Sequence, residues 1–353
     1  MVIVHVAGVN TNMISGVNAV VPQHVKAQSQ FAQVCLVNVR NINVIDDDLQ
    51  CEYKGVKNFP DYLPAPFDRP DIVVFHEVNN FEYVRLYKNL LSRHIPYVIV
   101  PHGENTRGAL RKKFWKKKIA YILFFNRFIR KAKALQCLSS GEYEETRTSD
   151  KKIIIPNGME LHERRDRPAK HDGMRLLYIG RLDWTHKGLD ILIEAVSKTD
   201  VPGIELDIFG PDYAGRRAVV TGMIEKHGCA DKIHMHEPIF GEDKVAEYAC
   251  CDLFIQTSRF EGLPLGLLEA MSYGVPVIAT EGTNLTKEIE KYDAGFTART
   301  DAESVKEAIE IAFGEKDDWE RKGDNARTLV ETEFSWKNIA KEAVEKYKEL
   351  TDE

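Results

Sequence analysis

The sequence predicts an α/β protein made of two Rossmann-like domains, each built on a doubly wound parallel sheet. Short apolar runs rich in valine and isoleucine alternate along the chain with amphipathic segments of helical periodicity. Several runs, such as 71–77 and 96–103, are apolar without alternation, which is typical of parallel strands buried on both faces. The chain has 353 residues, more than one ordinary core accommodates, so two domains are expected.

Each half of the chain carries its own set of expected strands. In the first half they are 1–8, 32–39, 71–77, 96–103, 134–140 and 152–158. In the second half they are 174–182, 204–211, 232–238, 251–258, 276–280 and 294–298. Helical periodicity marks the segments 187–199, 243–251, 304–314 and 334–353. Repeated β–α units of this kind predict ligands outside the carboxyl ends of the strands.

A polar and charged segment at 159–173 separates the two halves and holds a proline and a glycine. We therefore expect an N-terminal domain at 1–160 and a second domain at 161–335. The last segment, 336–353, is expected to be a helix that crosses back to the first domain. The two Rossmann-like domains are expected to face each other across a cleft.

Composition narrows the possible classes of protein. The chain is 43% hydrophobic and 29% charged, with a net charge of −6, which indicates a globular protein and argues against nucleic-acid binding by the whole chain. The start lacks a basic region before its apolar run, and no stretch reaches the ~18 apolar residues of a spanning helix. The cysteines at 35, 51, 137, 229, 250 and 251 have no C-x-x-C spacing. We expect reduced core thiols in a cytoplasmic protein.

Two glutamates in the segment RFEGLPLGLLEAM (259–271) call for an explanation. Pro264 suits the first turn of a helix that ends near Gly274, so Glu261 precedes the helix and Glu269 lies within it. The backbone N–H groups at this helix start would attract an anion between the two carboxylates. The pair is open to four interpretations: an acid and a base, a metal site, acceptors for a polyol, or solvated surface charges.

The segment 258–280, SRFEGLPLGLLEAMSYGVPVIAT, resembles the E-x7-E signature of retaining GT-B glycosyltransferases, in particular glycosyltransferase family 4. Other stretches resemble that family in the same order: IIIPNGME (153–160), LLYIGRLDWTHKGLDILIEA (176–195), AGF (294–296) and FSW (334–336). The resemblance is strong over roughly 150–340 and weaker before that. It implies the GT-B fold for the whole chain.

The resemblance also implies roles for individual residues in binding a nucleotide diphosphate sugar. Arg181 and Lys187 would hold the diphosphate, which suits a forked guanidinium and an ammonium point charge. Glu261 would accept hydrogen bonds from the transferred sugar, and Glu269 from the ribose. The remaining donor-binding positions are backbone contacts at Gly16, Gly262, Leu263 and Leu265. The base is expected near 209–213 and 236–241.

Histidines supply the other candidate site residues. His102 ends an expected strand, and the resemblance implies that it lies over the donor sugar. His76 also ends a strand and is a second candidate for the cleft, with an ordinary strand-end histidine as the alternative. His234 and His236 share one face of a strand, but no further ligands cluster nearby in the sequence, so a zinc site is not expected.

The expected reaction is transfer of a hexose-type sugar to a hydroxyl group with retention at the anomeric carbon. Arg181 and Lys187 would stabilise the leaving diphosphate, so we expect neither a metal nor another cofactor. A UDP-sugar is favoured because UDP is the common donor nucleotide. Alternatives are a non-catalytic nucleotide-sugar-binding partner, or a nucleotide-sugar epimerase of the same fold.

The segment 107–134 is strongly basic, although the whole chain has a negative net charge. It holds eleven lysines or arginines, no acidic residue and interleaved aromatic residues. A patch that binds an anionic membrane surface fits best. A helix that buries its aromatic side is the alternative, and nucleic-acid binding is the weakest interpretation. The membrane interpretation implies a glycan or lipid-linked acceptor in surface polysaccharide synthesis, and a protein peripheral to the inner face of the membrane.

Overall fold

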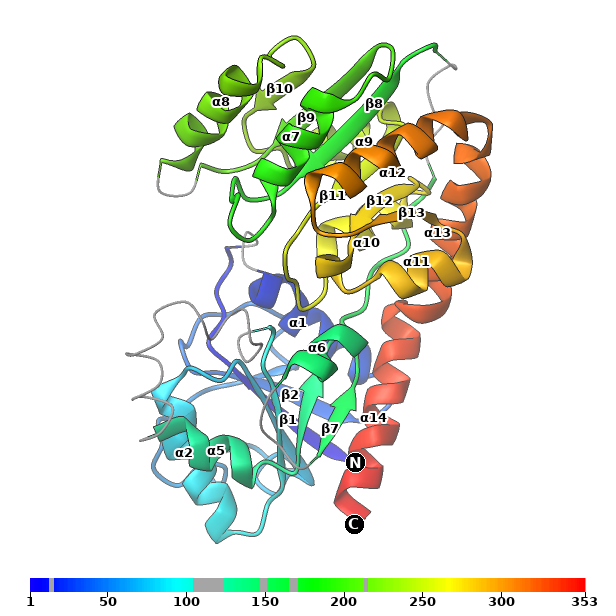
Figure 1. Ribbon diagram of the computed structural model, residues 1–353. Helices are drawn as coiled ribbons and strands as arrows, with labels where there is room; N and C mark the ends of the chain where they lie inside the picture. Colours follow the sequence, from blue (N-terminus) through cyan, green and yellow to red (C-terminus); the bar gives the residue numbers. More distant parts are fainter. Residues whose placement is uncertain (13–15, 104–123, 147–150, 165–170, 213–214, 353) are drawn as a thin grey trace. The chain divides into compact units, whose positions relative to one another are not determined.

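The computed structural model describes residues 1–12, 16–103, 124–146, 151–164, 171–212 and 215–352. The chain divides into two compact units (Figure 1). Unit 1 consists of Met1–Gly158 and Phe334–Glu353, and unit 2 of Met159–Glu333. These boundaries lie two residues from the expected ones, and the C-terminal segment is part of unit 1.

Unit 1 is built on a seven-stranded sheet with the order β3-β2-β1-β4-β5-β6-β7, in which all pairs are parallel. The strands are β1 (Val2–Ala7), β2 (Gln33–Asn38), β3 (Gln50–Cys51), β4 (Ile72–His76), β5 (Tyr97–Val100), β6 (Ala134–Cys137) and β7 (Lys152–Ile154). The sequence does not predict β3, because two residues are too short a run to show a pattern. The central strands β1 and β4 are buried almost throughout, as their continuous apolar runs predict.

The helices of unit 1 include one from the end of the chain. Among the residues that the structure describes they are α1 (Gly16–Gln28), α2 (Phe81–Ser92), α5 (Asn126–Lys131), α6 (Ser140–Glu145) and α14 (Trp336–Asp352). α14 packs against α1 through an apolar face that buries Ile339, Val344 and Tyr347 (Figure 1). No helix in the part of the chain that the structure describes is long and apolar enough to cross a membrane.

Unit 2 has a six-stranded parallel sheet with the order β10-β9-β8-β11-β12-β13. The strands are β8 (Met174–Ile179), β9 (Ile204–Phe209), β10 (Ile233–His236), β11 (Leu253–Gln256), β12 (Val277–Thr280) and β13 (Gly295–Ala298). β8 and β11 are neighbours in this sheet. The strands that follow β8 along the chain, β9 and β10, extend the sheet on one side, and those that follow β11, β12 and β13, extend it on the other. Such a switch point is where open α/β sheets bind ligands.

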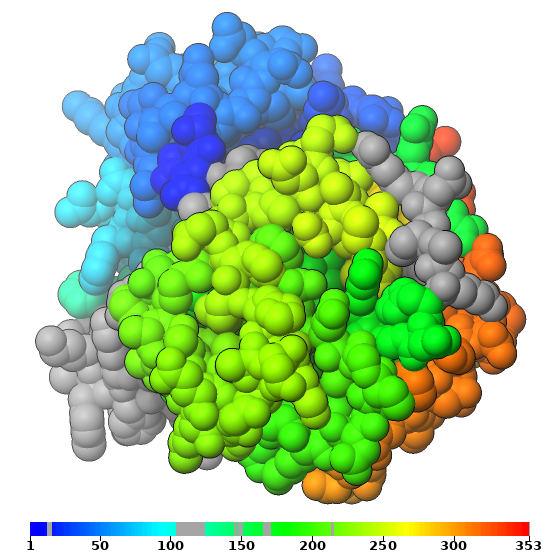
Figure 2. Space-filling model, turned by 90° about the horizontal axis from the view of Figure 1, so that it is seen from above, coloured from blue at the N-terminus to red at the C-terminus, as the bar shows by residue number. Residues whose placement is uncertain are grey.

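The helices of unit 2 are α7 (Leu189–Lys198), α8 (Arg216–His227), α9 (Gly241–Cys250), α10 (Leu265–Ser272), α11 (Thr286–Tyr292), α12 (Ala302–Gly314) and α13 (Trp319–Glu333), with short 3₁₀ turns at Glu281–Thr283 and Lys316–Asp318. α12 begins two residues before the expected segment because the Asp301 side chain caps it, accepting a hydrogen bond from the Ser304 N–H at 2.9 Å. α8 and α9 bury few side chains and lie on the surface of unit 2 (Figure 2, light green to yellow-green).

Two expectations from composition need correction. Five of the six cysteines are buried free thiols, but Cys250, the last residue of α9, is exposed. In the basic segment, residues 107–123 lie outside the described residues. Of the aromatics that follow, Phe124 is exposed, whereas Phe125 and Phe128 are core residues. These two side chains are therefore unavailable to a membrane surface.

Candidate functional site

The loop after β8 is held close to the end of β11. Gly188 adopts a left-handed conformation with φ of 68°, and a Cβ atom there would lie 2.0 Å from the Thr257 carbonyl oxygen. The Asp183 carboxylate organises the loop by accepting hydrogen bonds from the Thr185 N–H at 2.9 Å and the His186 N–H at 3.2 Å. The loop therefore presents the side chains of residues 181–187 beside β11, at the switch point of the sheet.

Lys187 and Glu261 form the centre of the site. The Lys187 ammonium donates to Glu261 Oε1 at 2.5 Å, and both side chains are largely buried. The same oxygen accepts from the Ser258 hydroxyl at 2.8 Å and from the Gln256 amide at 3.1 Å. Burial would raise the pKa of Glu261, but the charges of Lys187 and His186 and the hydrogen bonds from Lys187 and Ser258 hold it below its usual value. Glu261 is therefore a carboxylate at neutral pH.

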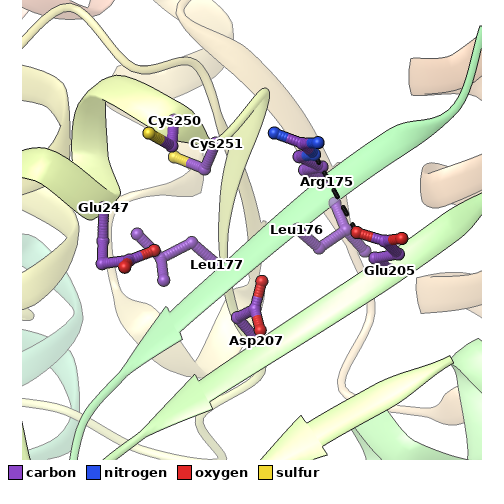
Figure 3. Close-up of a pocket in the computed structure, with 8 residues that line it drawn as sticks. All are labelled: Arg175, Leu176, Leu177, Glu205, Asp207, Glu247, Cys250 and Cys251. Atoms are coloured by element: carbon purple, nitrogen blue, oxygen red, sulfur yellow. Dashed lines mark ion pairs between the residues drawn. The ribbon is translucent and has the colours of Figure 1, made fainter. Parts of the chain in front are cut away.

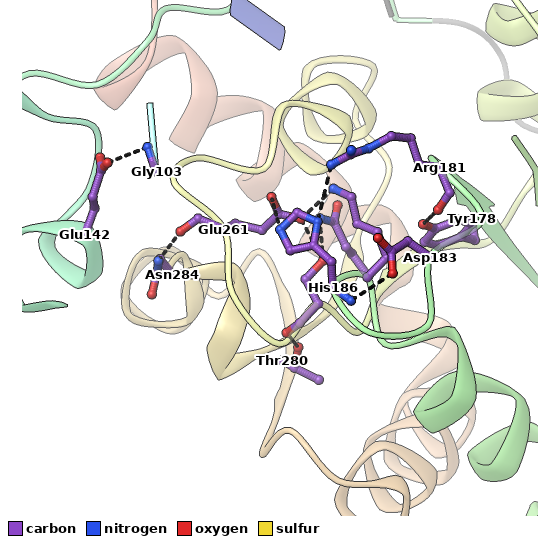
Figure 4. A network of polar contacts seen from close by, with 12 residues as sticks. Gly103, Glu142, Tyr178, Arg181, Asp183, His186, Glu261, Thr280 and Asn284 are labelled. Atoms are coloured by element: carbon purple, nitrogen blue, oxygen red, sulfur yellow. Dashed lines mark hydrogen bonds and ion pairs between the residues drawn. The ribbon is translucent and has the colours of Figure 1, made fainter. Parts of the chain in front are cut away.

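Arg181 joins this cluster through His186 (Figure 4). Arg181 Nη2 donates to His186 Nδ1 at 3.3 Å, and His186 Nε2 lies 3.9 Å from Glu261 Oε2. The His186 ring also contacts the Phe260 ring, with centroids 4.4 Å apart. The structure thus brings together three residues that the sequence singles out, Arg181, Lys187 and Glu261, and adds His186, which sequence reasoning missed.

The segment that carries Glu261 is fixed from several sides. The Asn284 amide donates to the Glu261 carbonyl, and the Thr280 hydroxyl donates to the Ser258 carbonyl at 2.8 Å (Figure 4). Arg259 forms a two-pronged ion pair with Asp190 of α7, with both N–O distances 2.7 Å. Fixing the backbone in this way keeps the Glu261 carboxylate in one position.

The start of α10 follows Glu261 directly. Pro264 occupies the N-cap position, and its carbonyl accepts from the N–H groups of Leu267 at 3.0 Å and Leu268 at 3.2 Å. A helix start exposes backbone N–H groups and carries partial positive charge. The expected anion site at Gly262, Leu263 and Leu265 therefore lies on a loop and helix start next to the Lys187–Glu261 pair.

Glu269 lies on α10, one turn after Leu265, and its charge is paired with a residue that the sequence did not single out. Its Oε2 accepts from the Lys244 ammonium of α9 at 2.5 Å, with both side chains partly exposed. Burial and the Glu269 charge raise the pKa of Tyr248, which lies on the same helix as Lys244. Sequence reasoning missed Lys244 because nothing in the surrounding sequence distinguishes it from the other charged residues of α9.

The two segments expected to hold a nucleotide base begin at the ends of β9 and β10 and contact each other there. The Phe209 and His236 rings stack with centroids 4.4 Å apart, and His236 Nε2 pairs with Asp207 Oδ1 at 2.6 Å. The Arg217 guanidinium donates to the His236 carbonyl at 2.7 Å. Within the described ranges, no group of three or more His, Cys, Asp and Glu side chains could hold a metal ion.

A cavity of about 120 Å³ lies elsewhere in unit 2, between β8, β9 and α9. Three carboxylates line it, from Glu205, Asp207 and Glu247, together with Arg175 and the thiols of Cys250 and Cys251 (Figure 3). Burial and the Asp207 charge raise the pKa of Glu247. The cavity shares no lining residue with the Lys187–Glu261 cluster and suits a negatively charged diphosphate poorly.

Unit 1 places His102 two residues after the end of β5 in a left-handed backbone conformation, with φ of 51°. The next residue, Gly103, donates its N–H to the buried Glu142 carboxylate at 2.7 Å (Figure 4). His102 is half-buried, and its Nε2 lies 3.0 Å from His76 Nδ1. Gly16 is the first residue of α1, and 13–15 before it lie outside the described residues.

The interpretation of His76 as a residue lining the cleft is wrong. Its side chain is 1% exposed, because it lies between the His5 and His102 rings. Sequence reasoning also missed His5, which is equally buried within β1. The available signal was a histidine inside a continuous apolar strand, where an unpaired polar group would be costly.

Known proteins resemble both the sequence and the structure. Residues 160–329 match the model of the family described as glycosyl transferases group 1. GDP-mannose:cellobiosyl-diphosphopolyprenol alpha-mannosyltransferase of Xanthomonas oryzae pv. oryzae is 24% identical over 311 residues, covering 84% of this chain and 79% of the relative. The family match and the relative's name support a glycosyltransferase.

Two solved structures resemble the whole chain. Sucrose-phosphate synthase from Thermosynechococcus elongatus superimposes with a TM-score of 0.75 at 17% identity, over 99% of this chain and 98% of that one. Anabaena HepE in complex with UDP gives a TM-score of 0.73 at 15% identity, over 99% and 100%. The expected fold class, GT-B with two parallel-sheet α/β domains, is confirmed.

Proposed function

We propose that the protein is a retaining glycosyltransferase of family 4 that uses a nucleotide diphosphate sugar. It transfers a hexose-type sugar to a hydroxyl group of a glycan or lipid-linked acceptor. The match to glycosyl transferases group 1 over 160–329 supports this proposal, because it covers nearly all of unit 2. The mannosyltransferase relative, whose name includes a diphosphopolyprenol, supports the lipid-linked acceptor.

The observation that carries the proposal is the Arg181–His186–Lys187–Glu261 cluster beside the start of α10. Lys187 and Arg181 bring two positive charges to the switch point of the sheet, next to exposed N–H groups. This combination suits the two phosphates of a donor, since charged donors form the strongest hydrogen bonds to phosphate oxygens. A diphosphate would compete with Glu261 for the Lys187 ammonium.

Glu261 would then select the sugar. Its carboxylate is ionised and fixed by Ser258 and Gln256, so it can accept hydrogen bonds from sugar hydroxyls when Lys187 turns to the diphosphate. We propose that the Glu269 carboxylate accepts hydrogen bonds from the ribose hydroxyls. It would do so while it is also paired with Lys244. The segments that begin at Phe209 and His236, at the ends of β9 and β10, would hold the base.

Charge stabilisation would provide most of the catalysis. The diphosphate gains negative charge as its bond to the sugar breaks, and Arg181, Lys187 and the start of α10 are arranged to stabilise that charge. We propose that these cations make a metal ion and other cofactors unnecessary. His102, from unit 1, would contact the transferred sugar.

Donor binding tests this function. We expect calorimetric titration to show binding of UDP-glucose or GDP-mannose without added metal; UDP is favoured, while the relative's name makes GDP the necessary comparison. Lys187→Ala and Glu261→Ala should each weaken binding about 10-fold or more, because each removes a charged hydrogen bond. Lys198→Ala is the matched control, since Lys198 pairs with Glu194 on the exposed side of α7.

We also propose that the protein binds the inner face of an anionic membrane through basic residues of 107–134. Each lysine or arginine near anionic lipid contributes about 1 kcal/mol. Flotation with vesicles that contain or lack phosphatidylglycerol measures this. Equal recovery with both vesicle types would contradict it.

A further inference from the structure

Three histidines form a continuous hydrogen-bonded row in unit 1. His5 lies on β1, His76 ends the neighbouring β4, and His102 follows β5. His5 Nδ1 lies 2.9 Å from His76 Nε2, and His76 Nδ1 lies 3.0 Å from His102 Nε2. Successive rings stack with centroids 5.2 Å and 5.3 Å apart.

The pattern of contacts restricts the protonation of the row. Each contact joins Nδ1 of one ring to Nε2 of the next, and a neutral imidazole carries one proton. If one ring has its proton on Nε2, its neighbours must also have theirs on Nε2, and the same holds for Nδ1. Burial keeps the rings neutral, because it lowers the pKa of His5 and of His102 to about 3 and that of His76 well below its usual value.

The group at the start of the row therefore decides between the two arrangements. His5 Nε2 lies 3.1 Å from Oε1 of Gln28, the fully buried last residue of α1. With the amide oxygen facing it, His5 must donate from Nε2, and all three rings carry their protons on Nε2. If the Gln28 amide were turned over, its N–H would face His5 and every ring would carry its proton on Nδ1.

Residues beyond Gln28 fix the direction in which the Tyr347 hydroxyl donates. The Gln136 amide N–H donates to the Ile155 carbonyl at 3.2 Å, so Gln136 Oε1 is turned to accept from the Tyr347 hydroxyl at 2.5 Å. The Tyr347 oxygen, having donated its proton, can only accept from the next group. The Ile155 carbonyl, which can only accept, thus sets the direction of the hydrogen bonds as far as Tyr347.

The Gln28 amide nitrogen is buried and makes no hydrogen bond to any residue that the structure describes. The Gln28 side chain nevertheless interacts with the Tyr347 phenol. Burial raises the pKa of the Tyr347 phenol, and the Gln28 side chain opposes that rise, as an N–H group that faces the phenol oxygen does. An amide oxygen turned toward the phenol oxygen would meet no donor, so the observed orientation is the favourable one.

We propose that Tyr347, Gln28, His5 and His76 are positioning residues that fix His102 with its proton on Nε2 and present its Nδ1 to accept a hydrogen bond from a substrate hydroxyl. The half-buried His102 ring makes no hydrogen bond through Nδ1 to any residue the structure describes. The identification of that hydroxyl as one on a sugar rests on the proposed glycosyltransferase function. The tautomer itself does not depend on it.

Long-range ¹H–¹⁵N correlation of the full chain with ¹⁵N-labelled histidine tests the proposal, because bare and protonated ring nitrogens resonate far apart. The His102 signals are assigned by their loss in His102→Gln. We expect a bare Nδ1 and a protonated Nε2 in the wild-type protein, with a population ratio above about 10, which corresponds to about 1.4 kcal/mol. A protonated Nδ1 on His102 would overturn the proposal.

Two variants show whether the row of residues, and not the tautomer preference of a free imidazole, determines which nitrogen of His102 carries the proton. Gln28→Met removes the acceptor for His5, and Tyr347→Phe removes the hydroxyl that orients Gln28. Both should move the His102 population toward that of a free neutral imidazole. Tyr97→Phe is the matched control, because the buried Tyr97 hydroxyl donates to the Phe128 carbonyl outside the row, at 2.6 Å. An unchanged population in both test variants would contradict the proposal.

Measurements of nucleotide binding and of turnover distinguish a failure of this proposal from a failure of the glycosyltransferase function on which it builds. UDP affinity, which depends on unit 2, should be unchanged in Tyr347→Phe, while kcat/KM with UDP-glucose or GDP-mannose falls. Absence of nucleotide-sugar binding and turnover in the wild-type protein would refute the proposed function and leave the tautomer result standing. The opposite tautomer in a protein that turns over would refute only the positioning row.

Discussion

Both units place candidate site residues at the carboxyl ends of parallel strands, but they offset the cost of burying polar groups in opposite ways. In unit 1, His5 and His76 are buried without charge and satisfy each other by hydrogen bonds. In unit 2, Glu261 is buried with its charge and is satisfied by Lys187. Parallel-sheet topology therefore decides where a site forms, and the side chains decide whether it orients neutral groups or stabilises charge.

The two units should therefore be destabilised by different changes. A row of neutral rings is disturbed by protons, which create charges that it cannot accommodate. A buried ion pair is disturbed by removal of either partner, which leaves a charge without compensation.

The largest effect is expected from breaking the ion pair in unit 2. Lys187→Ala leaves the Glu261 carboxylate buried without its cation and should lower the free energy of unfolding by about 3 kcal/mol. Lys187→Ala combined with Glu261→Gln should recover part of that loss, because the stranded charge is removed. Chemical denaturation measures both. A double variant no more stable than Lys187→Ala would show that the charge was not the cause.

Acid should destabilise unit 1 through its buried histidines. Burial lowers the pKa of His5 to about 3 and of His24 to about 4, from 6.5. Below pH 6.5 the unfolded chain binds protons that the folded unit does not, so stability falls as pH falls toward these values. The loss should be roughly 1.4 kcal/mol per histidine for each pH unit.

Denaturation at pH 7.5 and pH 5.5 measures this loss. His24→Gln removes one of the buried histidines and should reduce the pH dependence while the neutral-pH stability changes separately. An identical pH dependence in wild type and His24→Gln would contradict the assignment of the effect to this ring.

How far the sequence predicts these features depends on whether the interaction is local. The strands 71–77 and 174–182 are recognisable as buried because their apolar runs are continuous. Lys187 and Glu261 are recognisable because each stands at a fixed place in a family-like segment. Their ion pair, however, joins residues 74 positions apart, and spacing gives no sign of it.

The sequence does not predict the histidine row, for the same reason. His5 contacts His76 across 71 positions, and Gln28 and Tyr347 come from opposite ends of the chain. Only the burial of His5 in an apolar strand hinted at a partner. Likewise the pairing of Glu269 with Lys244 depends on how α9 and α10 pack, which neither helix's own pattern reveals.

The smallest effect is expected at that second ion pair of unit 2. Glu269 and Lys244 are both partly exposed, so Lys244→Ala should change the free energy of unfolding by no more than about 1 kcal/mol. By freeing Glu269 it should leave UDP binding intact or strengthen it, whereas Glu269→Ala should weaken binding. Calorimetric titration with UDP distinguishes these outcomes. Equal weakening by both variants would contradict the ribose-binding role of Glu269.

Donor binding to the Lys187–Glu261 cluster is the central claim, and calorimetric titration of the wild-type protein with UDP-glucose and GDP-mannose tests it most directly. We predict metal-independent binding of at least one of them, weakened about 10-fold or more in Lys187→Ala and in Glu261→Ala and unchanged in Lys198→Ala. Equal donor affinity in the wild type and in folded Lys187→Ala and Glu261→Ala proteins would contradict the account.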